Sequence, residues 1–176
     1  MPKQKLTKGE LKKQRDALKQ YQRYLPTLQL KKQQLQIEIL RQVFILDDRR
    51  REESEKRQLA ESWSGVLYAD PGIDVSKLLK LKGVLAGSKN IAGVDLPVFE
   101  RAEVELYEYD LFIAPVWVDS AVEALMAIVS LREEIKIIQR GIEISKQELR
   151  VATQRVNLFE KIKIPQSQEA IRLIKI

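Results

Sequence analysis

Cysteine and histidine are both absent from this chain of 176 residues. Without them the chain can hold no disulfide framework, no zinc site built from Cys and His, and no nucleophile activated by histidine. Glycine and proline are scarce, with seven and six residues, and aromatic side chains make up only 6%. This composition favours long helices over a compact globular core. We expect no catalytic residues, no metal site and no cofactor.

Long apolar runs are also missing. None approaches the roughly 20 residues that a membrane-spanning helix needs, so we expect no direct membrane insertion. The basic N-terminus lacks the apolar core of a secretory signal, and the absence of cysteine fits a reducing compartment. We therefore expect a cytoplasmic protein.

Charge is abundant but uneven, at 32% of residues. Residues 1–60 carry 16 Lys and Arg against 8 Asp and Glu, whereas residues 61–116 carry 5 against 9. The first region therefore has a net charge of +8 and the second of −4. Such asymmetry predicts different partners for a basic shaft and an acidic knob.

A heptad pattern runs through the first third of the chain. Eight of the eleven a and d positions between residues 11 and 46 are apolar or aromatic, which is typical of a coiled coil. Seam residues of this helix include Leu18, Leu25, Leu28 and Leu35. Pro26 falls inside the pattern, where either the helix kinks or a new helix starts with Pro26 in its first turn. The seam keeps its phase across this site, so we favour one continuous helix with a kink.

Residues 47–57 are almost wholly charged. Opposite charges recur at helical spacing, as in Arg49/Glu53 and Arg51/Glu55, and such pairs stabilise a helix by about 0.2–0.5 kcal/mol each. We interpret this run as solvated helix, with a specific docking patch as the alternative.

The middle of the chain holds five of the seven glycines. A turn signal at residues 70–72 is followed by runs of strand-forming residues at 81–85, 90–94 and 98–106, and residues 103–109 alternate acidic with apolar side chains. We predict a small antiparallel sheet or hairpin with one buried face. We interpret the carboxylates of this region as a solvated strand face or a protein-docking edge rather than a metal site. These carboxylates are Glu100, Glu103, Glu105, Glu108 and Asp110.

A second heptad pattern fills the last third. Nine of ten positions are apolar, and β-branched residues fill most of the a positions, which suits a two-stranded seam. These a positions are Ile128, Ile135, Ile142, Leu149 and Val156. Because the middle segment can reverse the chain, we expect antiparallel pairing within one chain rather than a homo-oligomer.

The predicted fold is therefore mainly α. A long antiparallel two-helix coiled coil joins the N- and C-terminal helices, with a small β-hairpin or loop knob between them. The expected boundaries are residues 1–66 for the first shaft helix, 67–116 for the knob and 117–176 for the second shaft helix. Pro165 lies near the end of the second, and Ile171 and Ile174 suggest a further helical piece, with a longer native tail beyond.

Two motifs resemble those of the D subunits of V-type (A/V-type) ATPases and ATP synthases, and the resemblance covers nearly the whole chain. The middle motif runs from Lys89 to Pro97 and includes Asn90, Ile91, Gly93, Val94 and Pro97. The C-terminal motif runs from Arg155 to Pro165 and includes Arg155, Val156, Asn157, Glu160, Ile164 and Pro165.

The resemblance implies a non-catalytic central rotor shaft whose paired termini enter a hexamer of A and B subunits. It implies the F subunit and the membrane-side d or C subunit as further partners, and a place peripheral to the membrane through the complex. Torque would pass between ATP hydrolysis or synthesis and translocation of H⁺ or Na⁺. The alternative is a generic coiled-coil tether or secretion-apparatus stalk. Basic residues interleaved with acids argue against nucleic acid as a partner.

Overall fold

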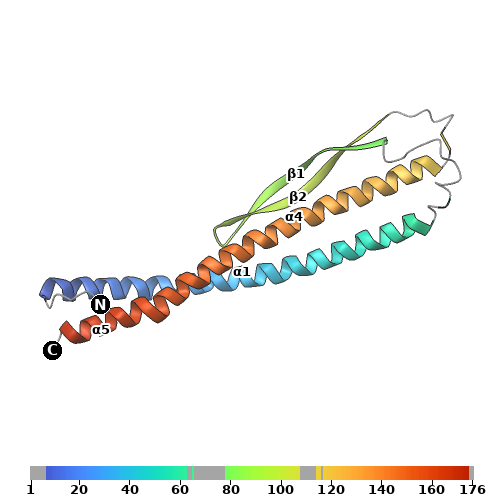
Figure 1. The fold of residues 1–176 in the computed structure, drawn as a ribbon. Coiled ribbons are helices and arrows are strands. Elements are labelled where there is room, and N and C mark those ends of the chain that lie inside the picture. Colours follow the sequence, from blue (N-terminus) through green and yellow to red (C-terminus); the bar gives the residue numbers. More distant parts are fainter. Residues whose placement is uncertain (1–6, 63–64, 66–77, 108–113, 116, 175–176) are drawn as a thin grey trace. The chain divides into compact units, whose positions relative to one another are not determined.

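Two long helices and a hairpin make up the described part of the chain. The computed structural model describes residues 7–62, 65, 78–107, 114–115 and 117–174. The elements in chain order are α1 (Lys8–Ser62), β1 (Leu79–Ile91), β2 (Val94–Leu106), α4 (Trp117–Leu158), the π-helical turn η1 (Phe159–Lys163) and α5 (Ile164–Ile174) (Figure 1). The predicted mainly α fold, with a small antiparallel hairpin between two long helices, is confirmed.

The chain forms two compact units. The terminal unit comprises Met1–Glu38 and Ser145–Ile176, and the central unit comprises Ile39–Ile144. Each unit contains one part of α1 and one part of α4. Both ends of the chain therefore belong to the same unit.

Helix α1 begins at a side-chain cap. The Thr7 hydroxyl accepts a hydrogen bond from the Glu10 backbone N–H at 3.3 Å, which satisfies one of the free donors of the first turn. The helix then continues through Pro26 without a break. Pro26 and Gln22, four residues earlier, are both exposed, so water can reach the Gln22 carbonyl that Pro26 leaves without a donor.

In the terminal unit, the first half of α1 lies beside the C-terminal helical segment. The Tyr21 and Phe159 rings approach with centroids 5.2 Å apart, and Lys31 forms an ion pair with Glu148 at 3.7 Å. Residue numbers rise along one helix as they fall along the other, so the helices are antiparallel. Their seam buries Leu35, Ala152 and Val156.

The central unit contains the same antiparallel pairing, supported by ion pairs between the helices. Arg49 Nε lies 3.0 Å from a Glu134 oxygen, and Arg132 Nε lies 2.9 Å from a Glu53 oxygen. Within α1, Arg49 pairs with Glu52 rather than with Glu53. The predicted Arg49/Glu53 pair is therefore wrong, because α4 offers each of these side chains a partner. The predicted Arg51/Glu55 pair is also wrong, because neither side chain forms an ion pair among the described residues.

The hairpin pairs nearly the whole length of its two strands. Ile91 lies opposite Val94 at the turn and Leu79 opposite Leu106 at the open end, with irregularities near residues 81–83 and 85–86. The predicted strand at 90–94 is wrong, because Ala92 and Gly93 form the turn between the strands. The predicted turn at 70–72 lies outside the described residues.

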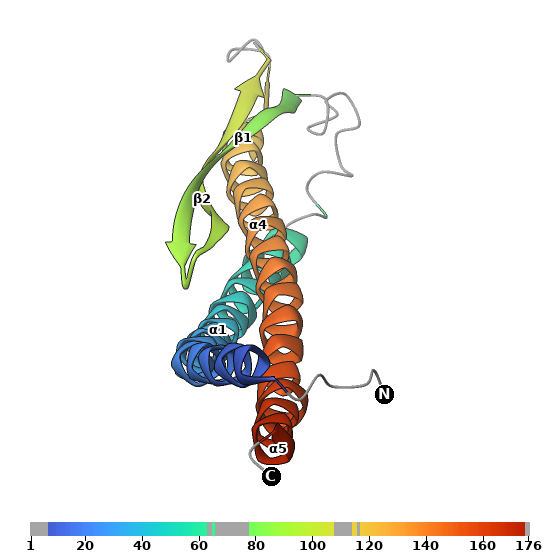
Figure 2. The same ribbon diagram turned by 90° about the vertical axis from the view of Figure 1, so that its left-hand side faces the viewer.

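One face of the hairpin is only partly covered. At the open end, Leu78 and Leu79 pack against the start of α4 at Val118, Ala121 and Val122. Figures 1 and 2 both show the hairpin running along the part of α4 that belongs to the same unit. The burial predicted from the 103–109 alternation is wrong at Leu106 and Tyr107, which are each 45% exposed, and residues 108–109 lie outside the described part.

Ile142 tests the seam of the central unit. This side chain is 5% exposed, so we expect Ile142→Ala to lower the free energy of unfolding by about 2–5 kcal/mol, since truncation leaves a cavity. Phe44→Ala is the control, because Phe44 is 76% exposed and its truncation should change stability by less than about 0.5 kcal/mol. Urea unfolding of the isolated chain measures both. Equal effects of the two substitutions would contradict the assignment of the seam.

Ser145 provides a second test of the seam, in which truncation of the side chain should raise stability instead of lowering it. It is completely buried, and its hydroxyl has no hydrogen-bond partner among the described residues. Because an unpaired buried hydroxyl costs about 1–3 kcal/mol, we expect Ser145→Ala to stabilise the chain by about 1 kcal/mol. The exposed Ser120 provides the control, and Ser120→Ala should leave the midpoint of thermal unfolding unchanged. A lower midpoint for Ser145→Ala would show that the hydroxyl has a partner.

Candidate functional site

The middle motif forms the turn of the hairpin. Asn90 closes this turn with its side chain: Asn90 Oδ1 accepts a hydrogen bond from the Gly93 backbone N–H at 3.1 Å. Asn90 Nδ2 donates to an Asp95 carboxylate oxygen at 2.6 Å, across the strand pair. A single amide therefore joins β1, the turn and β2.

The backbone of this turn is left-handed at two consecutive residues. Ala92 has a φ of 53° and Gly93 a φ of 73°. Two positive φ angles in a two-residue loop define a type I′ turn, whose twist matches that of the flanking strands. Glycine tolerates this conformation, whereas alanine at the first position is strained by about 1 kcal/mol.

The apolar members of the motif anchor the hairpin near its turn. Val94 is 7% exposed and Leu96 only 1%, while Ile91 and Pro97 are half-buried. Val94 and Leu96 are two residues apart in β2 and therefore share one face. The turn end of the hairpin is thus packed within the central unit rather than free in solvent.

The C-terminal motif contains a π-helical turn. The Ile164 backbone N–H donates to the Phe159 carbonyl, five residues earlier instead of four. The next residue, Pro165, has no N–H and its ring would crowd the carbonyl of residue 161 in a regular helix. A widened turn relieves that crowding, and α5 starts at once with Pro165 as its second residue.

Buried positions continue from α4 into α5 across the widened turn. Val156 is buried before the turn, and Ser167 and Ala170 are buried after it. Ala170 lies fourteen residues after Val156, which is two full heptads, so it keeps the register of the seam, whereas Ser167 lies one position beyond the d position at residue 166. Phe159, which contacts Tyr21, and Ile164 are half-buried, and the exposed members of the motif include Arg155, Asn157, Glu160 and Pro165.

The residues predicted to form the coiled-coil seam are all buried or half-buried. The buried ones are Leu35, Ile128, Ile142 and Val156. The half-buried ones are Leu18, Leu25, Leu28, Ile135 and Leu149. Only some seam positions are thus fully buried, because a pair of helices has no third layer to cover the edges of its seam.

The sequence interpretation missed a set of exposed apolar residues on α1. Leu30 and Ile37 are 53% and 67% exposed in the terminal unit, and Leu40 and Phe44 are 71% and 76% exposed in the central unit. In the heptad register of α1 these residues fall at b and f positions, which are usually polar in a two-stranded coiled coil. Marking apolar residues at outward positions would have found them.

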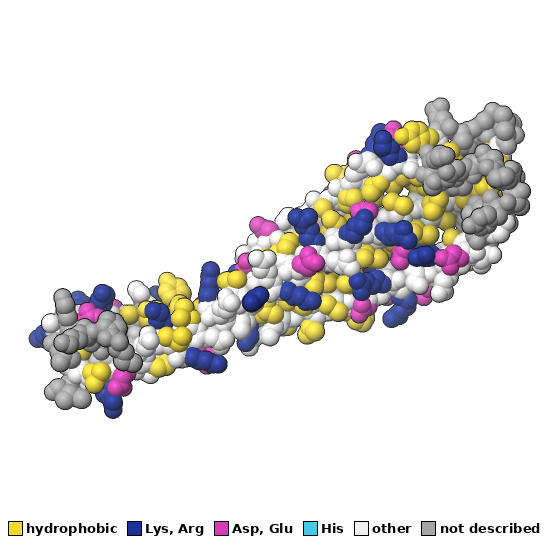
Figure 3. Space-filling view, in the orientation of Figure 1, with side chains coloured by type: hydrophobic (Ala, Val, Ile, Leu, Met, Phe, Trp, Pro, Cys, Tyr) yellow, Lys and Arg dark blue, Asp and Glu magenta, His cyan; other side chains and the backbone are white. Residues whose placement is uncertain are grey.

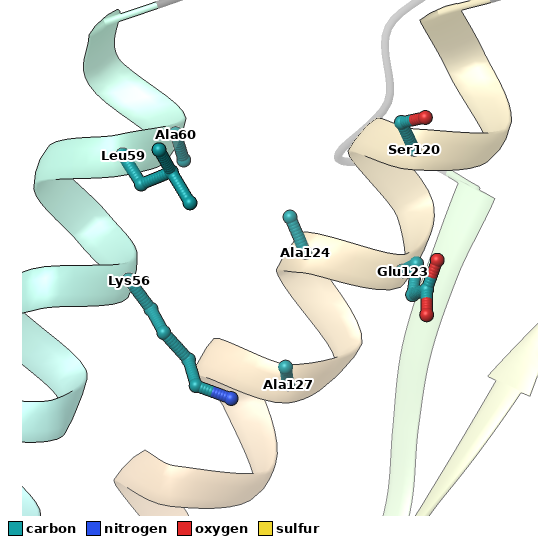
Figure 4. A pocket seen from close by; sticks show the side chains of 7 residues that line it. All are labelled: Lys56, Leu59, Ala60, Ser120, Glu123, Ala124 and Ala127. Atoms are coloured by element: carbon teal, nitrogen blue, oxygen red, sulfur yellow. The ribbon is translucent and has the colours of Figure 1, made fainter.

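A shallow groove lies between α1 and α4 within the central unit. It has a volume of about 380 Å³ and is lined from α1 by Lys56, Leu59 and Ala60, and from α4 by Ser120, Glu123, Ala124 and Ala127. Figure 4 shows the small alanine side chains on both walls, with Leu59 and Lys56 reaching from α1 toward α4. The polar side chains of its lining are Lys56, Ser120 and Glu123, and the chain has no histidine or cysteine that could act with them.

Charged side chains of both signs are scattered among hydrophobic side chains on the face shown in Figure 3. Arg49 lies between two carboxylates: its hydrogen bond to Glu52 and the charge of Glu134 raise the pKa of its guanidinium. Arg49 therefore stays charged at every physiological pH. The described residues include no group of carboxylates arranged to hold a metal ion, nor any helix with the length and apolarity that a membrane span requires.

The sequence matches the family described as the D subunit of ATP synthase over residues 10–176. The chain belongs to this family of ATP synthase D subunits. Both motifs, all of α4 and α1 from Glu10 onward lie within the matched range.

Individual members of the family align with the whole chain. A protein of Borreliella burgdorferi described as the D subunit of a V-type ATP synthase is 40% identical over 176 residues, covering 100% of this chain and 86% of that protein. A protein of Chlamydia trachomatis with the same description is 31% identical, covering 98% of this chain and 85% of its own length. A third, from Chlamydia pneumoniae, is 30% identical, covering 98% of this chain and 83% of its own length.

The hairpin turn predicts opposite effects at two neighbouring positions. Gly93→Ala should destabilise the chain by about 1 kcal/mol, because nothing lies near the added methyl group and only the positive φ opposes it. Ala92→Gly should stabilise it by up to about 1 kcal/mol, since glycine relieves strain at the same kind of φ. Urea unfolding and amide exchange of β1 and β2 measure both. Two changes of the same sign would contradict a type I′ turn.

Proposed function

We propose that this chain is the non-catalytic central-stalk rotor subunit of a V-type or A-type rotary ATPase. It transmits torque between ATP hydrolysis or synthesis in a hexamer of A and B subunits and H⁺ or Na⁺ translocation through a membrane ring. The observation that carries this proposal is the antiparallel pairing of the two chain ends in one unit, marked by Tyr21 and Phe159 and by Lys31 and Glu148, in a member of the family of ATP synthase D subunits.

The physical requirements of a shaft support the proposal. Torque needs an element that resists twisting, and two helices held by a seam and by cross-helix ion pairs are stiffer than one helix. The Arg49–Glu134 and Arg132–Glu53 pairs oppose sliding of α1 along α4. A pair of antiparallel helices from one chain also lacks three-fold symmetry, so it can present a different surface to each of three equivalent catalytic sites.

The two units support a division of the proposed partners between them. The terminal unit, which holds both chain ends, enters the cavity of the A/B hexamer. The central unit, with its hairpin and exposed apolar residues, provides the attachment region for the F subunit and for the membrane-side d or C subunit. The protein is thus peripheral to the membrane through the complex, and nucleotide chemistry belongs to the A and B subunits.

Co-expression tests these partners. We expect the full chain to co-purify with the F subunit and to associate with the A/B hexamer, because a central shaft has to hold both. Size-exclusion chromatography followed by identification of the associated chains measures the outcome. Failure to co-purify with either partner would contradict the rotor assignment and would favour a tether or stalk of another assembly.

Covalent cross-linking of this chain to the hexamer distinguishes a rotating subunit from a static one. The chain has no cysteine, so Lys12→Cys, at an exposed position of the terminal unit, gives a unique site for a photoactivated cross-linker. If the shaft rotates, cross-linking to an A or B subunit should abolish ATP hydrolysis by the assembled complex. The same labelled complex without illumination is the control. Full hydrolysis after complete cross-linking would exclude rotation of this chain.

A further inference from the structure

The two units differ sharply in net charge. The described residues of the terminal unit include fourteen Lys and Arg against six Asp and Glu, a net charge of +8. Those of the central unit include thirteen against fifteen, a net charge of −2. The positive charge expected along a basic shaft is therefore concentrated in the unit that holds the chain ends.

Most cations of the terminal unit also have no ion-pair partner among the described residues. In the central unit, seven of the thirteen cations form such pairs, whereas in the terminal unit only Lys31 and Arg172 do. The twelve others are Lys8, Lys12, Lys13, Arg15, Lys19, Arg23, Lys32, Lys146, Arg150, Arg155, Lys161 and Lys163. Unpaired charges of one sign repel one another and destabilise the compact state, so a partner surface of opposite charge would be stabilising.

Both helical segments of the terminal unit carry these cations. Lys12 and Lys19 are exposed on α1, and Lys146, Arg150 and Arg155 are exposed on α4. In the heptad registers of the two helices they occupy positions outside the a and d seam, on more than one side of the pair. A flat bilayer or a single groove could meet only one of these sides, whereas a surrounding wall could meet all of them.

We propose that the terminal unit is held by an acidic protein surface that surrounds it, through charge attraction without fixed ion pairs. The proposal rests on the proposed function, in which that surface is the inner wall of the A/B hexamer. Attraction between exposed charges acts over about 8–10 Å at physiological salt and needs no particular geometry. It can therefore hold the terminal unit in place at every angle, whereas a set of fitted ion pairs would favour a single angle.

Charge reversal in the full chain, with a matched control, tests this inference. The variant carries Lys12→Glu, Arg15→Glu and Lys19→Glu at exposed positions of the terminal unit. The control carries Arg50→Glu, Arg51→Glu and Arg140→Glu, three exposed cations of the central unit that form no ion pair within the described residues. Both triple variants change the net charge equally, and glutamate is a good helix former, so circular dichroism should show unchanged folding.

The readout is the affinity of the full chain, bound to the F subunit, for the A/B hexamer at low and high salt. At about 50 mM salt we expect the terminal variant to bind at least about tenfold more weakly than the wild type. The control variant should bind less than about threefold more weakly than the wild type. Near 500 mM salt the difference should largely disappear, because screening shortens the range of the attraction. Equal effects of the two variants, or an effect independent of salt, would overturn the inference while leaving the proposed function intact.

Two further outcomes have separate meanings. If the wild type fails to bind the hexamer at any salt concentration, both the proposed function and this inference are overturned. Vesicles containing phosphatidylserine provide the other arm. Binding of the wild type to these vesicles as tightly as to the hexamer, lost in the terminal variant, would assign the cations to a membrane surface instead and overturn the inference.

Discussion

The antiparallel pairing of α1 with α4 is the constraint on which the rest of the structure depends. A pair of helices has a single seam, so each helix can bury only a narrow stripe, and most of every turn stays in contact with solvent. Leu35 and Ile142 are among the few large side chains that this seam buries almost completely. Stability must therefore come from many modest contacts along the seam. This explains why ion pairs between the helices and small residues at close approaches matter more here than in a globular core.

Gly141 illustrates such a close approach. A glycine inside a helix costs about 1 kcal/mol relative to alanine. A Cβ at this position would lie 3.1 Å from Gln42 Oε1 on α1, so the missing side chain leaves room for a polar residue of the opposite seam. A glycine that weakens its own helix thus lets the two helices keep a polar residue between them. Polar seam residues weaken association but fix the register of the two helices, which the proposed rotor role requires.

The sequence was sufficient to predict the two helices and the hairpin, because periodicity reports directly on which face of an element is buried. It could not place the hairpin turn, since Ala92 gives no signal for a left-handed backbone. Nor could it pair Arg49 with Glu134: the stagger between two helices depends on the whole segment that joins them. The turn at Phe159–Lys163 was also missed, although Pro165 was visible, because proline can equally end a helix, kink it or widen one turn.

Charge placement gives the two units different mechanical characters. In the central unit, Arg49 and Arg132 each reach a particular carboxylate on the other helix, and such pairs specify one alignment of α1 with α4. In the terminal unit most cations have no partner within the described residues, so their energy varies little with the exact position of an opposing charge. In the proposed rotor, fixed pairs suit the part that must not slip internally. Unpaired like charges suit a part that must move past its surroundings, because no single contact has to break before the next can form.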